Sequence, residues 1–298
     1  GGGPARRPTP RPRGPRAAGA AAPEEATMAA RPTPVVFIHG LWLHSTSWEG
    51  WADVFRDAGY EPVLPEWPGV PPTVAEARLR GDDQAGVGLT EIADAHARVI
   101  RELDAPPVLV GHSVGGFIAQ HLLGEGLGAA AVAICPGQIR GVKAIGPAQA
   151  RSTFAFLSNP ANTRRAVSLS PEQFRYAFAN AVPEHEADEL YEKWTIPSPA
   201  RPLFQLALGN FTPHSPARVD TANRTRGPLL LLSGKLDHTV PDILTRATLK
   251  RYRHSAAITE YRRFDDRGHS LVVDHGWPEL ADASLTWLRR TTSLAAAS

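Results

Sequence analysis

A strand-like run near the middle of the chain breaks at a glycine-rich turn and continues as a helix-like pattern. Residues 108–110 read Val-Leu-Val, the next five read Gly-His-Ser-Val-Gly, and apolar side chains then recur at helical spacing to Leu123. The pattern predicts a buried strand, a sharp turn at Ser113 and a helix. Such a turn strains the backbone at the serine and exposes its hydroxyl, while Gly111 and Gly115 leave room that a Cβ atom would fill. A tight turn with a spectator serine is the alternative, and the flanking strand and helix favour a nucleophile.

The rest of the chain alternates short β-rich runs with helical patterns. The expected strands are residues 35–38, 61–64, 108–110, 131–135, 229–232 and 257–264. The other expected helices are residues 47–58, 89–103, 241–252 and 278–288. Alternation of this kind predicts an α/β fold with a mostly parallel central sheet and helices on both faces.

One long interval, residues 137–227, interrupts this alternation. It holds helical segments but no convincing strand, and one of its helices opens at the capping box Ser170-Pro171-Glu172-Gln173. The interval is too long for a loop in a compact domain, so we expect an inserted helical lid over the carboxyl ends of the strands. The core is then residues 32–136 and 228–292. The aromatic side chains of the lid favour a largely apolar substrate pocket.

Residues 1–31 differ in composition from everything that follows. They are rich in Gly, Pro, Ala and Arg, and six arginines against two glutamates give them a formal charge of +4. Because the whole chain carries +2, the remainder is about −2, which argues against a nucleic-acid partner for the folded part. We expect a disordered basic tail, with residues 1–27 either left over from an upstream extension or serving as a basic interaction arm.

The candidate nucleophile Ser113 has possible partners further along the chain. A serine hydroxyl attacks when a histidine takes its proton and a carboxylate orients that histidine. Where a serine lies on a strand–turn–helix of this kind, the expected chain order is Ser, acid, His, each on a loop after a strand. Asp237 follows the run 229–232 and His269 follows the run 257–264, so they are the expected acid and base. A helix-capping Asp237 and a solvated loop His269 are the alternatives. The rivals that fit the order or spacing less well are Asp265, Asp266, Asp274, His238 and His275.

Two loops offer backbone amides that could bind the oxyanion of a tetrahedral intermediate. Val114 follows the serine at a helix start, and Leu41 follows His39-Gly40, where glycine lets the backbone turn inward. We expect His39 to be a structural hydrogen-bonding residue. Trp42 and His112 lie next to these positions in the sequence and are candidates for the wall of the substrate pocket, with packing in the core as an equal alternative for Trp42.

The sequence also predicts several absences. No apolar run reaches the length of a membrane span, and the tail lacks the apolar stretch of a secretory signal, so we expect no membrane partner and a cytoplasmic location. Beyond Asp237-His238 and Asp274-His275, no close His, Asp or Cys cluster has metal-ligand spacing, so we expect neither a metal nor a cofactor. Cys135 is the single cysteine and ends an apolar run, which predicts a small core side chain and no intramolecular disulfide.

The strand–Ser–helix turn, the loop aspartate, the loop histidine and the His-Gly loop together resemble the α/β-hydrolase superfamily over about residues 33–292. The resemblance is to the serine branch of esterases, lactonases and cofactor-free haloperoxidase-like enzymes, in which a helical cap follows the sixth core strand. The roles that it implies are nucleophile for Ser113, base for His269, orienting acid for Asp237, and oxyanion amides for Leu41 and Val114.

The resemblance implies a serine hydrolase that cleaves a carboxylic ester, thioester or lactone of a small, largely apolar molecule through an acyl-enzyme. A lyase or C–C hydrolase that uses the same triad, as hydroxynitrile lyases do, is the alternative. A non-catalytic ligand receptor on the same scaffold is a third hypothesis, against which the complete set of triad residues speaks. Epoxide hydrolases and haloalkane dehalogenases place aspartate at the turn, so Ser113 argues against both.

Overall fold

The computed structural model describes residues 1–3 and 31–296 of the chain. The contacts divide the chain into residues 1–31 and residues 32–298, and the second unit is the one described below. Most of the expected disordered tail therefore lies outside the described residues, as do both interpretations of residues 1–27.

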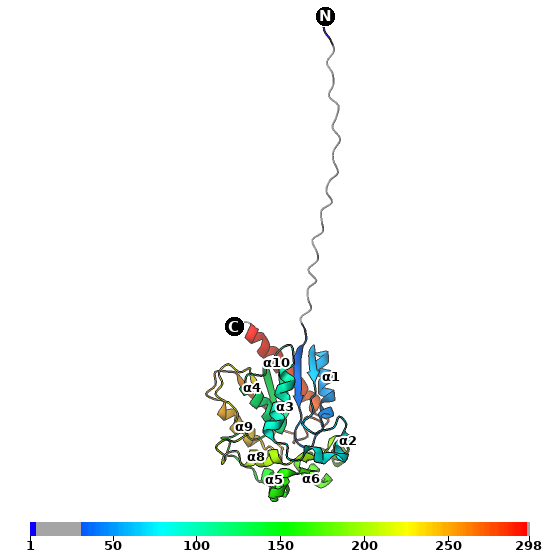
Figure 1. Cartoon of the computed structure of the whole chain (residues 1–298), viewed down its shortest axis with the longest axis vertical. Helices are drawn as coiled ribbons and strands as arrows, with labels where there is room; N and C mark the ends of the chain where they lie inside the picture. Colours follow the sequence, from blue (N-terminus) through cyan, green and yellow to red (C-terminus); the bar gives the residue numbers. More distant parts are fainter. Residues whose placement is uncertain (4–30, 297–298) are drawn as a thin grey trace. The chain divides into compact units, whose positions relative to one another are not determined.

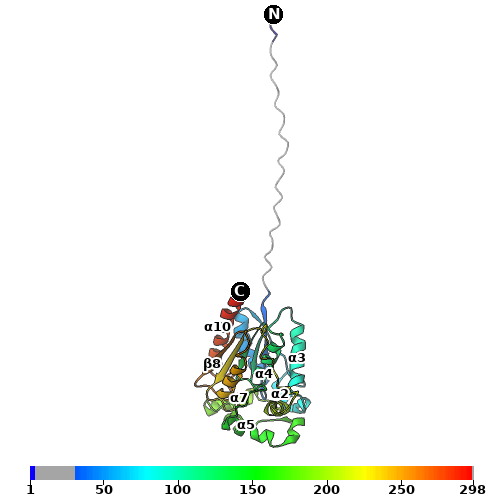
Figure 2. The same ribbon diagram turned by 90° about the vertical axis from the view of Figure 1, so that its left-hand side faces the viewer.

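A parallel sheet lies at the centre of the fold (Figures 1 and 2). It has six strands in the order β2-β1-β3-β4-β7-β8. Their bounds are β1 Thr33–Ile38, β2 Tyr60–Val63, β3 Val108–His112, β4 Ala130–Ile134, β7 Leu229–Gly234 and β8 Thr259–Phe264. The three central strands β3, β4 and β7 are buried along their whole length, because helices cover both of their faces. The predicted parallel sheet is confirmed, with each strand within two residues of its expected bounds.

Helices cover the sheet on both sides, as the sequence predicts. The bounds are α1 Glu49–Asp57, α2 Val74–Leu79, α3 Leu89–Arg101, α4 Val114–Gly124, α9 Asp242–Arg251 and α10 Trp277–Ala296. Figure 2 shows α10 on one side of the sheet and α3 with α4 on the other. α10 runs eight residues beyond its expected end, and the short helix α2 was not predicted. Within residues 31–296, no helix has the length and apolar character that crossing a bilayer requires.

The segment between β4 and β7 builds a separate group of short elements at the carboxyl end of the sheet, where Figure 1 shows α5, α6 and α8. Its elements are α5 Pro147–Leu157, β5 Ala166–Val167, α6 Pro171–Ala177, α7 Glu184–Trp194, β6 Ser198–Pro199 and α8 Arg201–Ala207. The predicted capping box is confirmed, since Ser170 accepts from the Gln173 amide and Gln173 accepts from the Ser170 amide. The antiparallel pair β5–β6 is a correction, because strands of two residues leave no periodic signal. That this group works as a lid remains a prediction.

Candidate active site

Ser113 lies at the turn between β3 and α4 in a strained conformation, with φ 56° and ψ −120°. A non-glycine residue in this region costs energy, and the surrounding structure must hold it there. The two glycines of the motif allow that packing. A Cβ on Gly111 would lie 2.2 Å from the Gly115 carbonyl oxygen, and one on Gly115 would lie 2.1 Å from the Ile38 carbonyl oxygen. The two glycines therefore let the turn pack closely against both α4 and the neighbouring strand β1.

Asp237 and His269 meet although they are 32 residues apart in the chain. Asp237 follows β7 and His269 follows β8, which is the neighbouring strand of the sheet. The His269 Nδ1–H donates to Asp237 Oδ2 over 2.6 Å, and both side chains are fully buried. The other carboxylate oxygen accepts the amides of Thr239 and Val240, each at 2.7 Å. The carboxylate is thereby fixed by three donors and in turn fixes the imidazole.

The rival acids and bases are each engaged elsewhere. His238 Nδ1 contacts the Tyr176 carbonyl oxygen, and His275 pairs with Glu186. The remaining rivals are likewise occupied, with Asp265 paired to Arg263, Asp266 paired to Arg267, and Asp274 accepting from Ser270 and Gly276. Of the acids and bases weighed from the sequence, the structure brings together Asp237 and His269.

The far side of the His269 ring faces a small aromatic enclosure. Phe178 stands edge-on to it with ring centroids 4.7 Å apart, and His112 lies 4.5 Å away. His269 Nε2 is buried and has no hydrogen-bond partner among the described residues, so it does not bond Ser113 Oγ in this structure. In enzymes without substrate the bond from nucleophile to base is commonly loose and tightens when substrate binds.

A cavity of about 540 Å³ opens above Ser113. Ser113, Leu41 and Val114 all line it, as does Trp42. The loop before Leu41 runs close to the serine, since a Cβ on Gly40 would lie 2.8 Å from Ser113 Cβ. Val114 is the first residue of α4, so its amide has no carbonyl partner within the helix. The arrangement can present two amides to an oxygen beside Ser113.

The two pocket-wall candidates end in different places. Trp42 lines the cavity and is fixed by two hydrogen bonds. Its backbone N–H donates to Ser198 Oγ over 2.7 Å, and its indole N–H donates to the Val167 carbonyl over 3.0 Å. His112 is fully buried and is not among the residues that line the cavity. Burial lowers the pKa of His112 well below its usual value, so its ring is neutral packing against His269.

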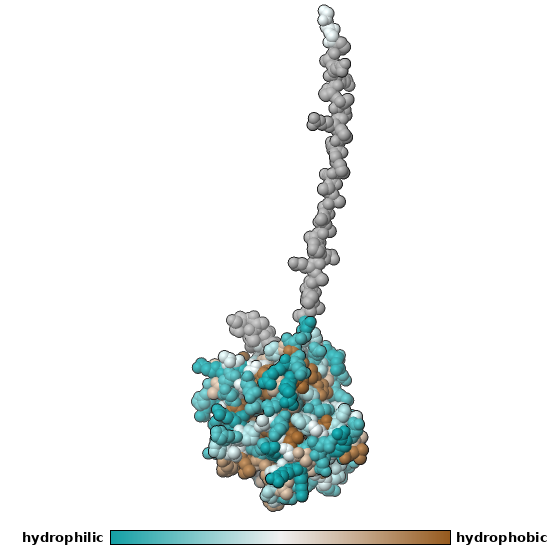
Figure 3. All heavy atoms as spheres, in the orientation of Figure 1, coloured by the Kyte–Doolittle hydropathy of each residue, from teal (hydrophilic) through white to brown (hydrophobic). Residues whose placement is uncertain are grey.

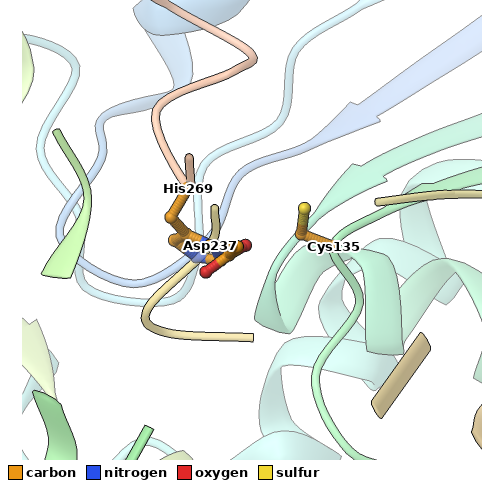
Figure 4. Close-up of side chains that lie close together, drawn as sticks. All are labelled: Cys135, Asp237 and His269. Atoms are coloured by element: carbon orange, nitrogen blue, oxygen red, sulfur yellow. The ribbon is translucent and has the colours of Figure 1, made fainter. Parts of the chain in front are cut away.

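Cys135 is a neighbour of the site that the sequence analysis placed only in the core. It follows β4 with φ 42°, and its Sγ lies within 4.8 Å of the ligand atoms of Asp237 and His269 (Figure 4). By distance alone these three groups could reach one metal ion. Burial raises the thiol pKa well above its usual value, and both Asp237 oxygens already accept hydrogen bonds, so the donor set suits a neutral thiol beside a carboxylate. The signal available in the sequence was the place of Cys135 at the end of a strand, whereas the pairing of that strand with β7 was not.

A second group of titratable side chains lies behind the loop that carries Leu41. His39 stacks on Trp67 with centroids 4.6 Å apart, and its Nε2 lies 3.9 Å from a Glu66 carboxylate oxygen. Burial lowers the pKa of His39 to about 3 and raises that of Glu66. The ring is therefore neutral near pH 7, and its Nδ1 contacts the Gly40 carbonyl at 2.9 Å. These contacts support the structural role expected for His39.

Comparisons with known proteins give the same architecture. A model of the alpha/beta hydrolase family matches residues 35–283. Similar solved structures include a monoacylglycerol lipase from Paleococcus ferrophilus (20% identity, TM-score 0.60, covering 86% of this chain and 95% of that one) and a methylesterase from Arabidopsis (15%, 0.60, 88% and 99%). An extracellular alpha/beta-hydrolase from a Paenibacillus species is also similar (18%, 0.61, 86% and 98%). No curated protein matches the chain. At these identities the solved structures indicate the fold alone.

Proposed function

The chain belongs to the alpha/beta hydrolase family, and on that premise we propose that it is a serine hydrolase that cleaves a carboxylic ester, thioester or lactone. The observation that carries the proposal is the buried pair His269–Asp237, bonded at 2.6 Å, at the same end of the sheet as the strained Ser113. The Ser113 side chain borders an apolar cavity, which is where a bound acyl group would sit.

The proposed reaction forms an acyl-enzyme in its first half. Ser113 Oγ attacks the carbonyl carbon while His269 Nε2 takes the hydroxyl proton. Asp237 stabilises the resulting imidazolium through Nδ1, and the amides of Leu41 and Val114 stabilise the oxyanion. When the tetrahedral intermediate collapses, the bond from carbon to the leaving oxygen or sulfur breaks and His269 returns its proton to that atom.

The second half consumes one water. His269 takes a proton from the water, whose oxygen attacks the acyl carbon of the Ser113 ester. The new tetrahedral intermediate releases Ser113 Oγ, which regains a proton from His269, and the acid product leaves. The products are the carboxylic acid and the alcohol or thiol, or a hydroxy acid when the substrate is a lactone.

We propose a small and largely apolar substrate, because most side chains around the cavity are apolar. They include Trp42, Leu157, Leu203, Leu206 and Val240. Two of the similar structures are named as a monoacylglycerol lipase and a methylesterase, which supports ester chemistry on this fold.

The test is a panel of p-nitrophenyl esters, thioesters, lactones and cyanohydrins offered to the wild type and to Ser113→Ala. We expect ester hydrolysis to fall about 10⁴-fold or more in the variant, since removal of a nucleophile leaves only binding and oxyanion stabilisation. The exposed Ser168 gives a matched control, and Ser168→Ala should keep its rate. Near-normal hydrolysis by Ser113→Ala would refute the nucleophile, and cleavage of cyanohydrins alone would favour the lyase.

A further inference from the structure

Large apolar side chains gather at the mouth of the cavity and are left in solvent. Ile145, Phe154 and Phe211 all line the cavity, yet they are 72%, 71% and 82% exposed. Leu208, one turn before Phe211, is 53% exposed. These four make up half of the eight large apolar side chains that are exposed in the part of the chain that the structure describes. Exposed apolar groups gathered around one opening mark a place of contact more often than isolated ones do.

Two of these side chains, Ile145 and Phe154, lie in a segment whose charged residues are all basic. Residues 137–170 contain no aspartate or glutamate and five cationic residues, namely Arg140, Lys143, Arg151, Arg164 and Arg165. The next segment, residues 171–198, has the opposite balance, with six acidic and two basic residues. The folded part of the chain carries about −2 overall, so the positive charge is local to this segment.

Lys143 brings that charge to the mouth itself. It is the one charged residue among those that line the cavity, it is exposed, and no ion pair holds it within the described residues. The side of the molecule that carries α5 and α8 shows brown apolar patches among teal polar ones (Figure 3). The mouth therefore combines apolar side chains that could enter a headgroup layer with a lysine that could pair with its phosphates.

We propose that this surface, residues 143–154 with residues 208–211, docks on an anionic lipid surface. The contact is peripheral, with the apolar side chains at the boundary between headgroups and acyl chains and Lys143 among the phosphates. A protein partner bound to the same residues would cover the mouth of the cavity, whereas an amphiphilic molecule can enter the cavity from a fluid lipid surface. Delivery of a substrate in this way rests on the proposed function, but the docking itself does not. The proposal revises the sequence-based expectation of no membrane partner, which rested on the lack of a spanning segment.

The experiment is sedimentation of the full chain with vesicles of phosphatidylcholine alone and of an equal mixture of phosphatidylcholine and phosphatidylglycerol. We expect binding to the mixed vesicles, weak binding to phosphatidylcholine, and a decrease as salt is added. The double variant Phe154→Ser with Phe211→Ser should lower the partition coefficient at least about tenfold. Lys143→Glu should weaken binding to the mixed vesicles by about tenfold and change binding to phosphatidylcholine little.

Leu79→Ser is the matched control, because Leu79 is 87% exposed on α2 and does not line the cavity. It should bind as the wild type does. Absence of binding to mixed vesicles would overturn the proposal, as would equal losses in Leu79→Ser and the double variant. Light scattering that shows a dimer dissociated by the double variant would assign the surface to a second copy and would also count against it.

The measurement uses no substrate and is repeated on Ser113→Ala, which should bind vesicles as the wild type does. A chain that binds vesicles without hydrolysing any ester would leave the docking surface standing and remove the proposed function. A chain that hydrolyses esters without binding vesicles would do the reverse.

Discussion

The strand-end loops of the sheet and the segment between β4 and β7 meet at the same cavity but are built in opposite ways. Ser113, Asp237 and His269 are at most 6% exposed, and each is held by backbone contacts or hydrogen bonds. Across the cavity, α5 turns Phe154 to solvent at 71% exposure. The sheet thus holds the proposed reacting groups in place, and we propose that the inserted segment determines what can approach them.

This division has a physical reason. A general base and its acid must hold their geometry within fractions of an ångström, and a network of buried hydrogen bonds supplies that rigidity. Access requires a surface that can exchange contacts with substrate, and exposed side chains on short helices provide one. The comparison predicts that changes in the loops alter turnover, whereas changes on the outer face of the insertion leave the fold unaffected.

The largest effect should come from Asp237→Asn. The amide cannot reproduce a carboxylate that accepts from His269 and from two backbone amides, so the imidazole loses its orientation and the imidazolium its counter-charge. We expect kcat on an ester substrate to fall about 10⁴-fold. The control is Asp265→Asn, an exposed residue paired with Arg263, which should lower kcat little. If kcat fell by similar factors in the two variants, the buried carboxylate would have no special role compared with an exposed one nearby.

Two phenylalanines of α5 sharpen the comparison within the insertion itself. Phe156 is 5% exposed and packs on Trp42 with ring centroids 5.0 Å apart, whereas Phe154, two residues earlier, is 71% exposed. We expect Phe156→Ala to lower the free energy of unfolding by about 3 kcal/mol or more and Phe154→Ala by less than about 0.5 kcal/mol. Denaturant unfolding followed by tryptophan fluorescence measures both. If Phe154→Ala destabilised the protein as strongly, its side chain would be part of the core and not of an access surface.

The sequence predicted the sheet well because its strands are local patterns. The same patterns place the candidate triad at strand ends, and the catalytic roles of its residues stay a prediction. Buried strands such as β3 and β7 are continuous apolar runs, and Ser113, Asp237 and His269 each follow a strand end. Parallel pairing then brings those ends to one edge of the sheet, and the pairing of β7 with β8 brings Asp237 and His269 together. The glycines at 111 and 115 were also predictable, because the turn leaves no space for a Cβ atom.

The features that escaped prediction depend on contacts between distant segments. Cys135 reaches Asp237 only because β4 pairs with β7. His112 was a candidate for the pocket wall, yet the turn directs it inward against His269. Phe154 and Phe211, which are exposed at the mouth of the cavity, could not be told apart in the sequence from the other aromatic residues of the lid. Their orientation depends on how short helices pack and not on periodicity.

The smallest effect should appear in the dependence of stability on pH, again as a contrast between buried and exposed groups. Burial lowers the pKa of His39 to about 3 and that of His96 to about 4, from an ordinary value of 6.5. Below pH 6.5 these histidines therefore bind protons in the unfolded chain but not in the folded chain. As the pH falls, each one lowers the free energy of unfolding by up to about 1.4 kcal/mol per pH unit, until the pKa of the folded state is reached.

Comparing variants isolates this contribution, because Glu66 and Asp274, whose pKa values burial raises, act in the opposite direction. For His96→Leu the difference from wild type in unfolding free energy should shift in favour of the variant as pH falls from 7 to 5. For Ser168→Ala, which changes an exposed side chain of the insertion and removes no titratable group, that difference should stay constant. Urea unfolding at the two pH values measures both differences. If the unfolding free energies of His96→Leu and the wild type changed equally between pH 7 and pH 5, His96 would have to bind a proton in the folded state. The core would then be more accessible to water than its packing indicates.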